Sequence, residues 1–98
     1  MASTKDYKEF IMEQLSLLDS VTYKPMMGEY ILYYNGIIFG GIYDDRLLVK
    51  KVDTNKEYEM KEVIPYKNAK PMYFVEDVDN MDTLKDIVLD TVRGLNNG

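Results

Sequence analysis

The side chains that could do chemistry in this chain are carboxylates, lysines, tyrosines and a few serines, because it has no histidine and no cysteine. That absence removes the usual general base, the thiol nucleophiles and nearly every zinc-site pattern. Ser3, Ser16 and Ser20 lie in or beside the first predicted helix and lack the glycine-rich elbow of a serine hydrolase. We therefore expect a protein that is not an enzyme and that holds no catalytic residue, cofactor or metal ion.

Carboxylates are most concentrated just before the last predicted helix. The cluster comprises Glu76, Asp77, Asp79 and Asp82. Paired carboxylates can act as acid and base, but negative side chains also stabilise the start of a helix through its dipole. The run from Asp77 begins like a calcium loop, yet Met81, Asp82 and Val88 stand where a ligand, a glycine and a glutamate are needed. We expect these carboxylates to stabilise the N-terminus of the helix rather than to act in catalysis or bind calcium.

Lysines and tyrosines offer a binding surface instead. The net charge of −5 disfavours a polyanion, whereas the segment 24–70 carries eight basic against seven acidic residues and could form a modest basic face. A mixed, solvated surface is the simpler alternative. Tyrosines lie on both faces of the predicted strands, at positions 30, 33, 34 and 43. Two interpretations stay open: one face exposes aromatic surface to a partner, or helices cover one face while the other face only places hydroxyls in water.

These side chains must be positioned by a small set of elements, of which the first is an amphipathic helix. Ser3 or Thr4 can cap it, and apolar residues then recur at the spacing of one buried face. These residues are Tyr7, Phe10, Ile11, Leu15 and Leu18. We expect the helix to end within 18–20, before a short strand over 21–24 that Pro25 stops and a bend at 26–28.

The central block predicts an antiparallel meander. Residues 30–34 and 37–43 are rich in β-formers, and Asn35-Gly36 between them favours a type I′ turn. A turn at 44–45 then leads into a strand over 47–52. The pattern therefore predicts three consecutive strands joined by tight turns.

The hairpin turn also predicts a register. A two-residue loop places Tyr34 opposite Ile37 and Leu32 opposite Phe39. Gly40-Gly41 lies within the middle strand, where glycine indicates a bulge or a close approach by another group. The simplest explanation is a helix packed tightly over the sheet.

The last third predicts mixed structure. Residues 56–63 read as a short helix, 72–75 as a further strand, and Asp79 or Asn80 as the cap of a final helix. The inner face of that helix comprises Leu84, Ile87, Val88, Thr91, Val92 and Leu95. The whole chain, 1–98, is expected to be one α+β domain in which an antiparallel β-meander sheet packs against N- and C-terminal helices.

The sequence also bears on location. Its longest run without charged or strongly polar side chains is residues 37–43, far below the roughly 20 residues that cross a bilayer. The first ten residues lack the apolar segment of a secretory signal, and cysteine is absent. We therefore expect a cytoplasmic protein without a membrane partner.

The run KPMMGEYILYYNGIIFGGIYDDRLLVK, residues 24–50, resembles the N-terminal domain of the TfoX family of competence regulators. It matches the family pattern at Lys24, Met26, Gly28, Tyr33, Gly36, Phe39, Leu47 and Lys50. It departs at Met27 and Leu48, where Phe and Tyr are usual. The resemblance implies an antiparallel sheet packed against helices and a link to transcriptional control of DNA uptake. Longer members carry a further C-terminal domain, and the resemblance brings no catalytic residue with it.

These observations lead to two hypotheses. The first is a non-catalytic regulatory module that contacts a protein, such as a transcription regulator, through the sheet face or the 26–28 loop. The second is direct nucleic-acid binding by basic and aromatic side chains of the meander, including Lys51. The candidate binding residues are Lys24, Met26, Met27, Gly28, Tyr33, Arg46 and Lys50. An exposed strand edge could also pair two copies into a homodimer.

Overall fold

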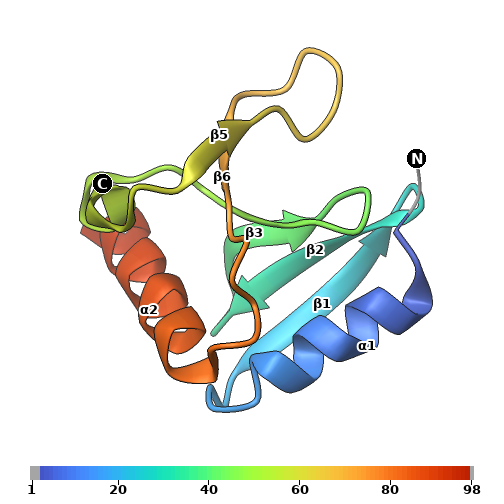
Figure 1. The fold of residues 1–98 in the computed structure, drawn as a ribbon, viewed down its shortest axis with the longest axis horizontal. Helices are drawn as coiled ribbons and strands as arrows, with labels where there is room; N and C mark the ends of the chain where they lie inside the picture. Colours follow the sequence, from blue (N-terminus) through green and yellow to red (C-terminus); the bar gives the residue numbers. More distant parts are fainter. Residues whose placement is uncertain (1–2, 98) are drawn as a thin grey trace.

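A computed structural model describes residues 3–97, so positions 1, 2 and 98 of the predicted 1–98 domain lie outside the described part. One antiparallel sheet runs in the order β1-β2-β3-β4-β6-β5 and packs against helices α1 and α2 (Figure 1). The strands are β1 Val21–Met26, β2 Glu29–Tyr34, β3 Ile37–Ile42, β4 Leu47–Val49, β5 Lys61–Val63 and β6 Met72–Phe74. The helices are α1 Lys5–Gln14, the 3-10 helix η1 Asp53–Tyr58 and α2 Met81–Asn97. The predicted α+β class is confirmed.

Helix α1 starts as predicted and ends earlier. The Thr4 side chain accepts a 3.1 Å hydrogen bond from the Tyr7 amide and caps the helix. The helix stops at Gln14 rather than within 18–20, because the Ser16 and Leu18 amides donate to carbonyls only three residues back, which tightens the chain into turns. Leu15 and Leu18 still reach the core from those turns.

Strand β1 continues through Pro25 to Met26, so the prediction that Pro25 stops it is wrong. The reason is that β1 is an edge strand. The Asn35 amide donates to the Ser20 carbonyl at 3.0 Å, and the β1–β2 register then places the Pro25 nitrogen on the side that faces away from β2. Proline there costs the sheet no hydrogen bond, and the edge has one donor fewer for pairing with another chain.

Tight turns join the first four strands, and each has two residues in the left-handed region. The Asn35-Gly36 turn is confirmed, with φ of 55° and 82°. The bend predicted at 26–28 is a second such turn, in which Met27 and Gly28 have φ of 50° and 83°. The third, at Asp44 and Asp45, has φ of 53° and 54°. Turns whose central residues have positive φ match the right-handed twist of the flanking strands, which explains why these short loops join hairpins.

The β2–β3 register departs from prediction after its first two pairs. Tyr34 pairs with Ile37 as expected, but Leu32 pairs with Gly40 because the register shifts between Leu32 and Tyr33. Phe39 is the extra residue of a β-bulge and is buried in the core. The turn geometry fixes the pairs next to it, whereas the bulge depends on how the two strands pack.

Gly40 and Gly41 have no room for a side chain, because neighbouring strands and the Tyr43 ring, rather than a helix, come close to them. A Cβ at Gly40 would collide with the Leu48 carbonyl oxygen of β4. A Cβ at Gly41 would lie 2.6 Å from the Tyr30 carbonyl oxygen and 2.7 Å from the Tyr43 ring. The expected helix over these glycines is therefore wrong, and the close approach of neighbouring strands and of the Tyr43 ring is the correct explanation.

The structure departs most from the sequence-based expectation over the segment 47–63. Strand β4 ends at Val49 rather than at residue 52, and the helix predicted over 56–63 is replaced by η1 and β5. Glu59 takes a left-handed φ of 55° at the end of η1, which turns the chain out of helical geometry. Lys61 then pairs with Phe74 of β6, so a partner distant in sequence decides the structure here.

Helix α2 completes the core. Asn80 caps it, since its Oδ1 accepts from the Thr83 amide at 3.1 Å. Its inner residues lie in one cluster with those of α1 and of the sheet. The fully buried aliphatic members are Ile11, Leu15, Leu32, Ile42, Leu47, Val49, Leu84 and Val88. Neither helix within residues 3–97 combines the length and the apolar character that crossing a bilayer would take.

Candidate binding site beside the loop of residues 64–71

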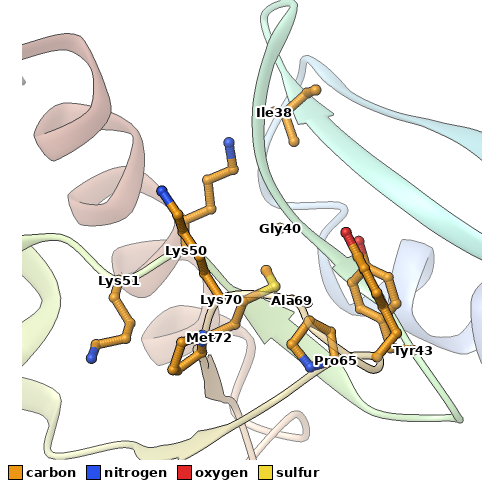
Figure 2. Close-up of a pocket in the computed structure, with 11 residues that line it drawn as sticks. Ile38, Gly40, Tyr43, Lys50, Lys51, Pro65, Ala69, Lys70 and Met72 are labelled. Carbon is orange, nitrogen blue, oxygen red and sulfur yellow. The ribbon is translucent and has the colours of Figure 1, made fainter.

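A hollow lies between β3, the segment after β4 and the loop of residues 64–71 that joins β5 to β6 (Figure 2). We call it the loop pocket, and its volume is about 550 Å³. It is lined by Ile38, Gly40, Tyr43, Lys50, Lys51, Pro65, Tyr66, Ala69, Lys70, Pro71 and Met72. This volume falls within the range of small-molecule sites, roughly 300 to 1,000 Å³.

The loop pocket adjoins the sheet face that turns away from the two helices. Leu32 faces the core, so its neighbours Ile31 and Tyr33 on β2 face the other way. Their strand partners, Lys24 on β1 and Ile38 on β3, share that side. We call these residues, Lys24, Ile31, Tyr33 and Ile38, the open face. Lys50 follows Val49, a core residue, and extends the open face into the loop pocket.

Two tyrosines form one wall of the loop pocket. The Tyr43 ring covers Gly41, and its centroid lies 6.0 Å from that of Tyr66, with the planes tilted by 47°. Burial raises the pKa of Tyr43, and the nearby Tyr66 and Glu29 raise it further. Tyr43 therefore stays protonated at neutral pH and can donate a hydrogen bond from its hydroxyl.

Lysines form the opposite wall. Figure 2 shows Lys50 and Lys70 on one side and Tyr43 on the other, with Gly40 between them. The Lys51 ammonium is held by Glu62 at 2.7 Å and lies 5.7 Å from the Tyr73 ring centroid, so it points out of the group. Lys50 and Lys70 form no ion pair with any described residue, and none of the described lining residues is acidic. The site therefore suits an anion attached to an apolar or aromatic body.

The structure divides the predicted binding residues between two places. Lys24 and Tyr33 lie on the open face, and Lys50 lines the loop pocket. Met26, Met27 and Gly28 lie at the β1–β2 turn, and Arg46 lies at the β3–β4 turn, where its Nε donates to the Tyr43 carbonyl at 3.3 Å. The predicted set is therefore not one contiguous patch, although its lysines at positions 24 and 50 share a face.

Ser3 and Thr4 bond the β1–β2 and β3–β4 turns, and we call this set of hydrogen bonds the N-terminal clasp. Ser3 donates from its amide to the Gly28 carbonyl at 3.0 Å and from its hydroxyl to Glu29 at 2.6 Å. The Thr4 amide donates to the Asp45 carboxylate at 2.8 Å. The clasp thus ties the Met27-containing turn to the β3–β4 turn. Met27 projects from this support with 95% of its surface exposed.

The sequence profile of the TfoX N-terminal domain matches residues 13–91. This chain belongs to that family. The match covers α1 from residue 13, the whole sheet and most of α2, so the resemblance predicted from residues 24–50 is confirmed. A relative described as "Uncharacterized 12.7 kDa protein in trpE 5'region", from Spirochaeta aurantia, is 32% identical over 80 residues. The aligned part spans 80% of this chain and 70% of the relative.

In this TfoX N-terminal domain, the residues that the 64–71 loop contributes to the loop pocket could not be predicted from the sequence. Tyr66, Lys70 and Met72 line the loop pocket, although nothing in their local pattern predicts that they meet β3. The only signal is the pair Pro65 and Pro71, which bracket an irregular stretch without stating where it folds.

The predicted carboxylate cluster of the TfoX domain lies elsewhere. Glu76 and Asp77 line a second hollow of about 360 Å³ with Glu59, beside β6 and α2. Across residues 3–97, no three histidine, cysteine or carboxylate residues gather as they would around a metal ion. Asn80, rather than one of these acids, supplies the helix cap.

Proposed function

We propose that this TfoX N-terminal domain is a non-catalytic regulatory module that binds an acidic segment of a partner protein across the open face. The observation that carries this proposal is that the open face presents Tyr33 and Ile38 between Lys24 and Lys50, while both described helices pack on the other side. Aromatic and apolar side chains framed by charges are typical of protein interfaces. Lysines at both ends favour a partner segment with carboxylates.

The family supports a regulatory role. TfoX proteins resemble this chain in sequence, and the family is linked to transcriptional control of DNA uptake, so a transcription regulator is the class of partner we propose. Met27 supports a contact surface that extends to the β1–β2 turn. A methionine with 95% exposure in a left-handed turn gains nothing from packing within the domain, and flexible methionines suit protein contacts.

Site-specific photocrosslinking tests this proposal. A crosslinking amino acid placed at Ile38, which is 38% exposed, should capture one specific protein in native cells, and nuclease treatment should not remove it. The same substitution at Leu89, which is 37% exposed on α2, is the matched control and should not capture that protein. Equal capture at both positions, or none at Ile38, would overturn the proposal.

Purified partner then allows a quantitative test. Lys24→Glu with Lys50→Glu should weaken binding by at least about tenfold, because a like charge facing an acidic segment repels it. Lys67→Glu is the control, since Lys67 is exposed on the loop and does not line the pocket. Equal losses in both proteins would show that overall charge, rather than the open face, governs binding.

Nucleic acid is a second candidate, supported by the lysines and tyrosines that share the loop pocket. The net charge of −5 opposes it. A labelled single-stranded oligonucleotide should show an anisotropy change at low salt that falls steeply as salt rises. An unchanged anisotropy at low salt would exclude this candidate.

A further inference from the structure

The two walls of the loop pocket differ in chemistry, and this asymmetry bears on what the pocket can hold. Cations lie on one side and tyrosine rings on the other, with the bare backbone of Gly40 between them (Figure 2). Backbone without a side chain allows a ligand to approach the strand closely. A ligand that spans the hollow would therefore place a negative group and a flat apolar group at opposite ends.

The cationic wall is built on a fixed backbone. The Lys50 amide donates to the Phe39 carbonyl at 2.8 Å, and the Lys50 carbonyl accepts from the Asn55 side chain at 2.9 Å. Hydrogen bonds at both its amide and its carbonyl therefore fix the backbone from which the Lys50 side chain extends. Since Glu62 holds Lys51, the ammonium groups available to a ligand are those of Lys50 and Lys70.

The aromatic wall has one fixed ring and one accessible ring. Tyr43 is buried against Gly41, whereas Tyr66 is 57% exposed. A flat ring stacking on Tyr66 would gain contact area, as bases do on the aromatic side chains of proteins that bind single-stranded nucleic acid. Ile38 and Met72 add apolar contacts on either side.

We propose that the loop pocket binds a small phosphate-bearing molecule with a flat aromatic ring, of which a mononucleotide is the representative. A phosphate monoester carries about −1.5 to −2 charges at pH 7, which two ammonium groups balance. Lysine is a compact point charge that suits phosphate. A longer polyanion would extend beyond the pocket over a chain whose net charge is −5, so a small anion is favoured over a nucleic acid. This inference does not require the proposed protein partner, although both proposals use Lys50 and Ile38.

The test is a titration of the full chain with adenosine monophosphate, followed by backbone amide shifts and calorimetry. Adenosine and inorganic phosphate are titrated separately. We expect the nucleotide to bind at least about tenfold more tightly than either part, with shifts centred on residues 38–43 and 65–72. Lys50→Gln and Lys70→Gln should each weaken binding about tenfold, and Tyr66→Ala should do so while Tyr66→Phe does not. Lys67→Gln is the matched control and should bind as the unaltered chain does.

Three outcomes would overturn the inference. Phosphate that binds as tightly as the nucleotide would mean that no ring is recognised. A Lys67→Gln loss equal to that of Lys50→Gln would mean that general charge attracts the anion. An acidic peptide that binds the pocket while the nucleotide does not would assign the pocket to the protein interface instead. Circular dichroism of each variant ensures that a loss of binding is not a loss of fold.

Discussion

Asn55 and Thr91 lie 36 residues apart and are joined by a buried hydrogen bond of 2.8 Å from Nδ2 to Oγ1. Asn55 also donates to the Lys50 carbonyl at 2.9 Å and accepts from the Val52 amide at 3.2 Å. The buried Asn55 side chain therefore connects η1, helix α2 and the backbone of Lys50, which lines the loop pocket.

Replacing Asn55 should destabilise the whole domain. Asn55→Ala leaves the Lys50 carbonyl and the Val52 amide without this partner, and buried unsatisfied groups cost about 1–3 kcal/mol each. We expect the free energy of unfolding in urea to fall by roughly 3 kcal/mol. Asn96→Ala, at an exposed position of α2, should change it by less than about 0.5 kcal/mol. Equal effects in the two proteins would contradict the role of Asn55.

The Tyr58–Asp90–Arg93 group should make stability depend on pH at both extremes. Hydrogen bonds from Arg93 and Tyr58 lower the pKa of Asp90 below its ordinary 3.8. Its contribution to stability is therefore complete above that value and is lost as the pH falls through the lower, folded pKa. Burial and the bond to Asp90 raise the pKa of Tyr58 above its ordinary 10.0. That contribution is complete below pH 10 and is lost as the pH rises through the folded pKa.

Two variants separate these contributions in urea unfolding measured across pH. Asp90→Asn should flatten the acid side of the stability profile, and Tyr58→Phe should flatten the alkaline side, because each removes one titrating group. Asp19→Asn, at an exposed position before β1, should leave the acid side unchanged. An acid profile that Asp19→Asn alters as much as Asp90→Asn would refute the assignment.

Gly94 in α2 should not tolerate alanine, because the added methyl group has no room. A Cβ there would lie 2.7 Å from the Val52 Cβ and closer still to the Thr54 hydroxyl. Alanine gains about 1 kcal/mol in helix propensity over glycine, but overpacking costs about 1–3 kcal/mol. We expect Gly94→Ala to lower the melting temperature and Asn96→Ala to leave it nearly unchanged. A stabilised Gly94→Ala protein would show that η1 can move away from α2.

Met27 should lower the stability of the domain while contributing to binding of the protein partner. A non-glycine residue in the left-handed region costs roughly 1–2 kcal/mol, and asparagine tolerates it better than methionine does. Met27→Asn should therefore stabilise the domain by about 0.5–1 kcal/mol while weakening capture of the protein partner. The reverse exchange in the next hairpin, Asn35→Met, should destabilise by a similar amount and leave capture intact. If Met27→Asn leaves partner binding unchanged, this turn is not part of the interface.

The features that could be predicted from the sequence are those that a few neighbouring residues decide. The Thr4 cap, the Asn35-Gly36 turn and the inner face of α2 each depend on local propensity or spacing, and the structure confirms them. The family resemblance of residues 24–50 was likewise visible in one continuous run, and the profile match extends it to 13–91.

The features that could not be predicted depend on partners distant in sequence. Strand β5 forms because Lys61–Val63 pairs with β6, although its own residues also suit a helix. The bulge at Phe39 and the extension of β1 through Pro25 follow from packing and from the position of a strand in the sheet. The loop pocket needs residues 64–71 to fold against β3, so Tyr66 and Lys70 gave no signal as site residues.

The run of tight turns that joins β1 to β4 also sets an order for folding. Closing a two-residue turn requires little loop entropy, so we expect these hairpins to form before contacts that span many residues. The clasp bonds of Ser3 to Glu29 and of Thr4 to Asp45 close loops of 26 and 41 residues and should form late. In pulse-labelling hydrogen exchange, the amides of β2 and β3 should gain protection first. Ser3 and Thr4 would then bond to hairpins that have already formed, and would fix the relative position of two of their turns.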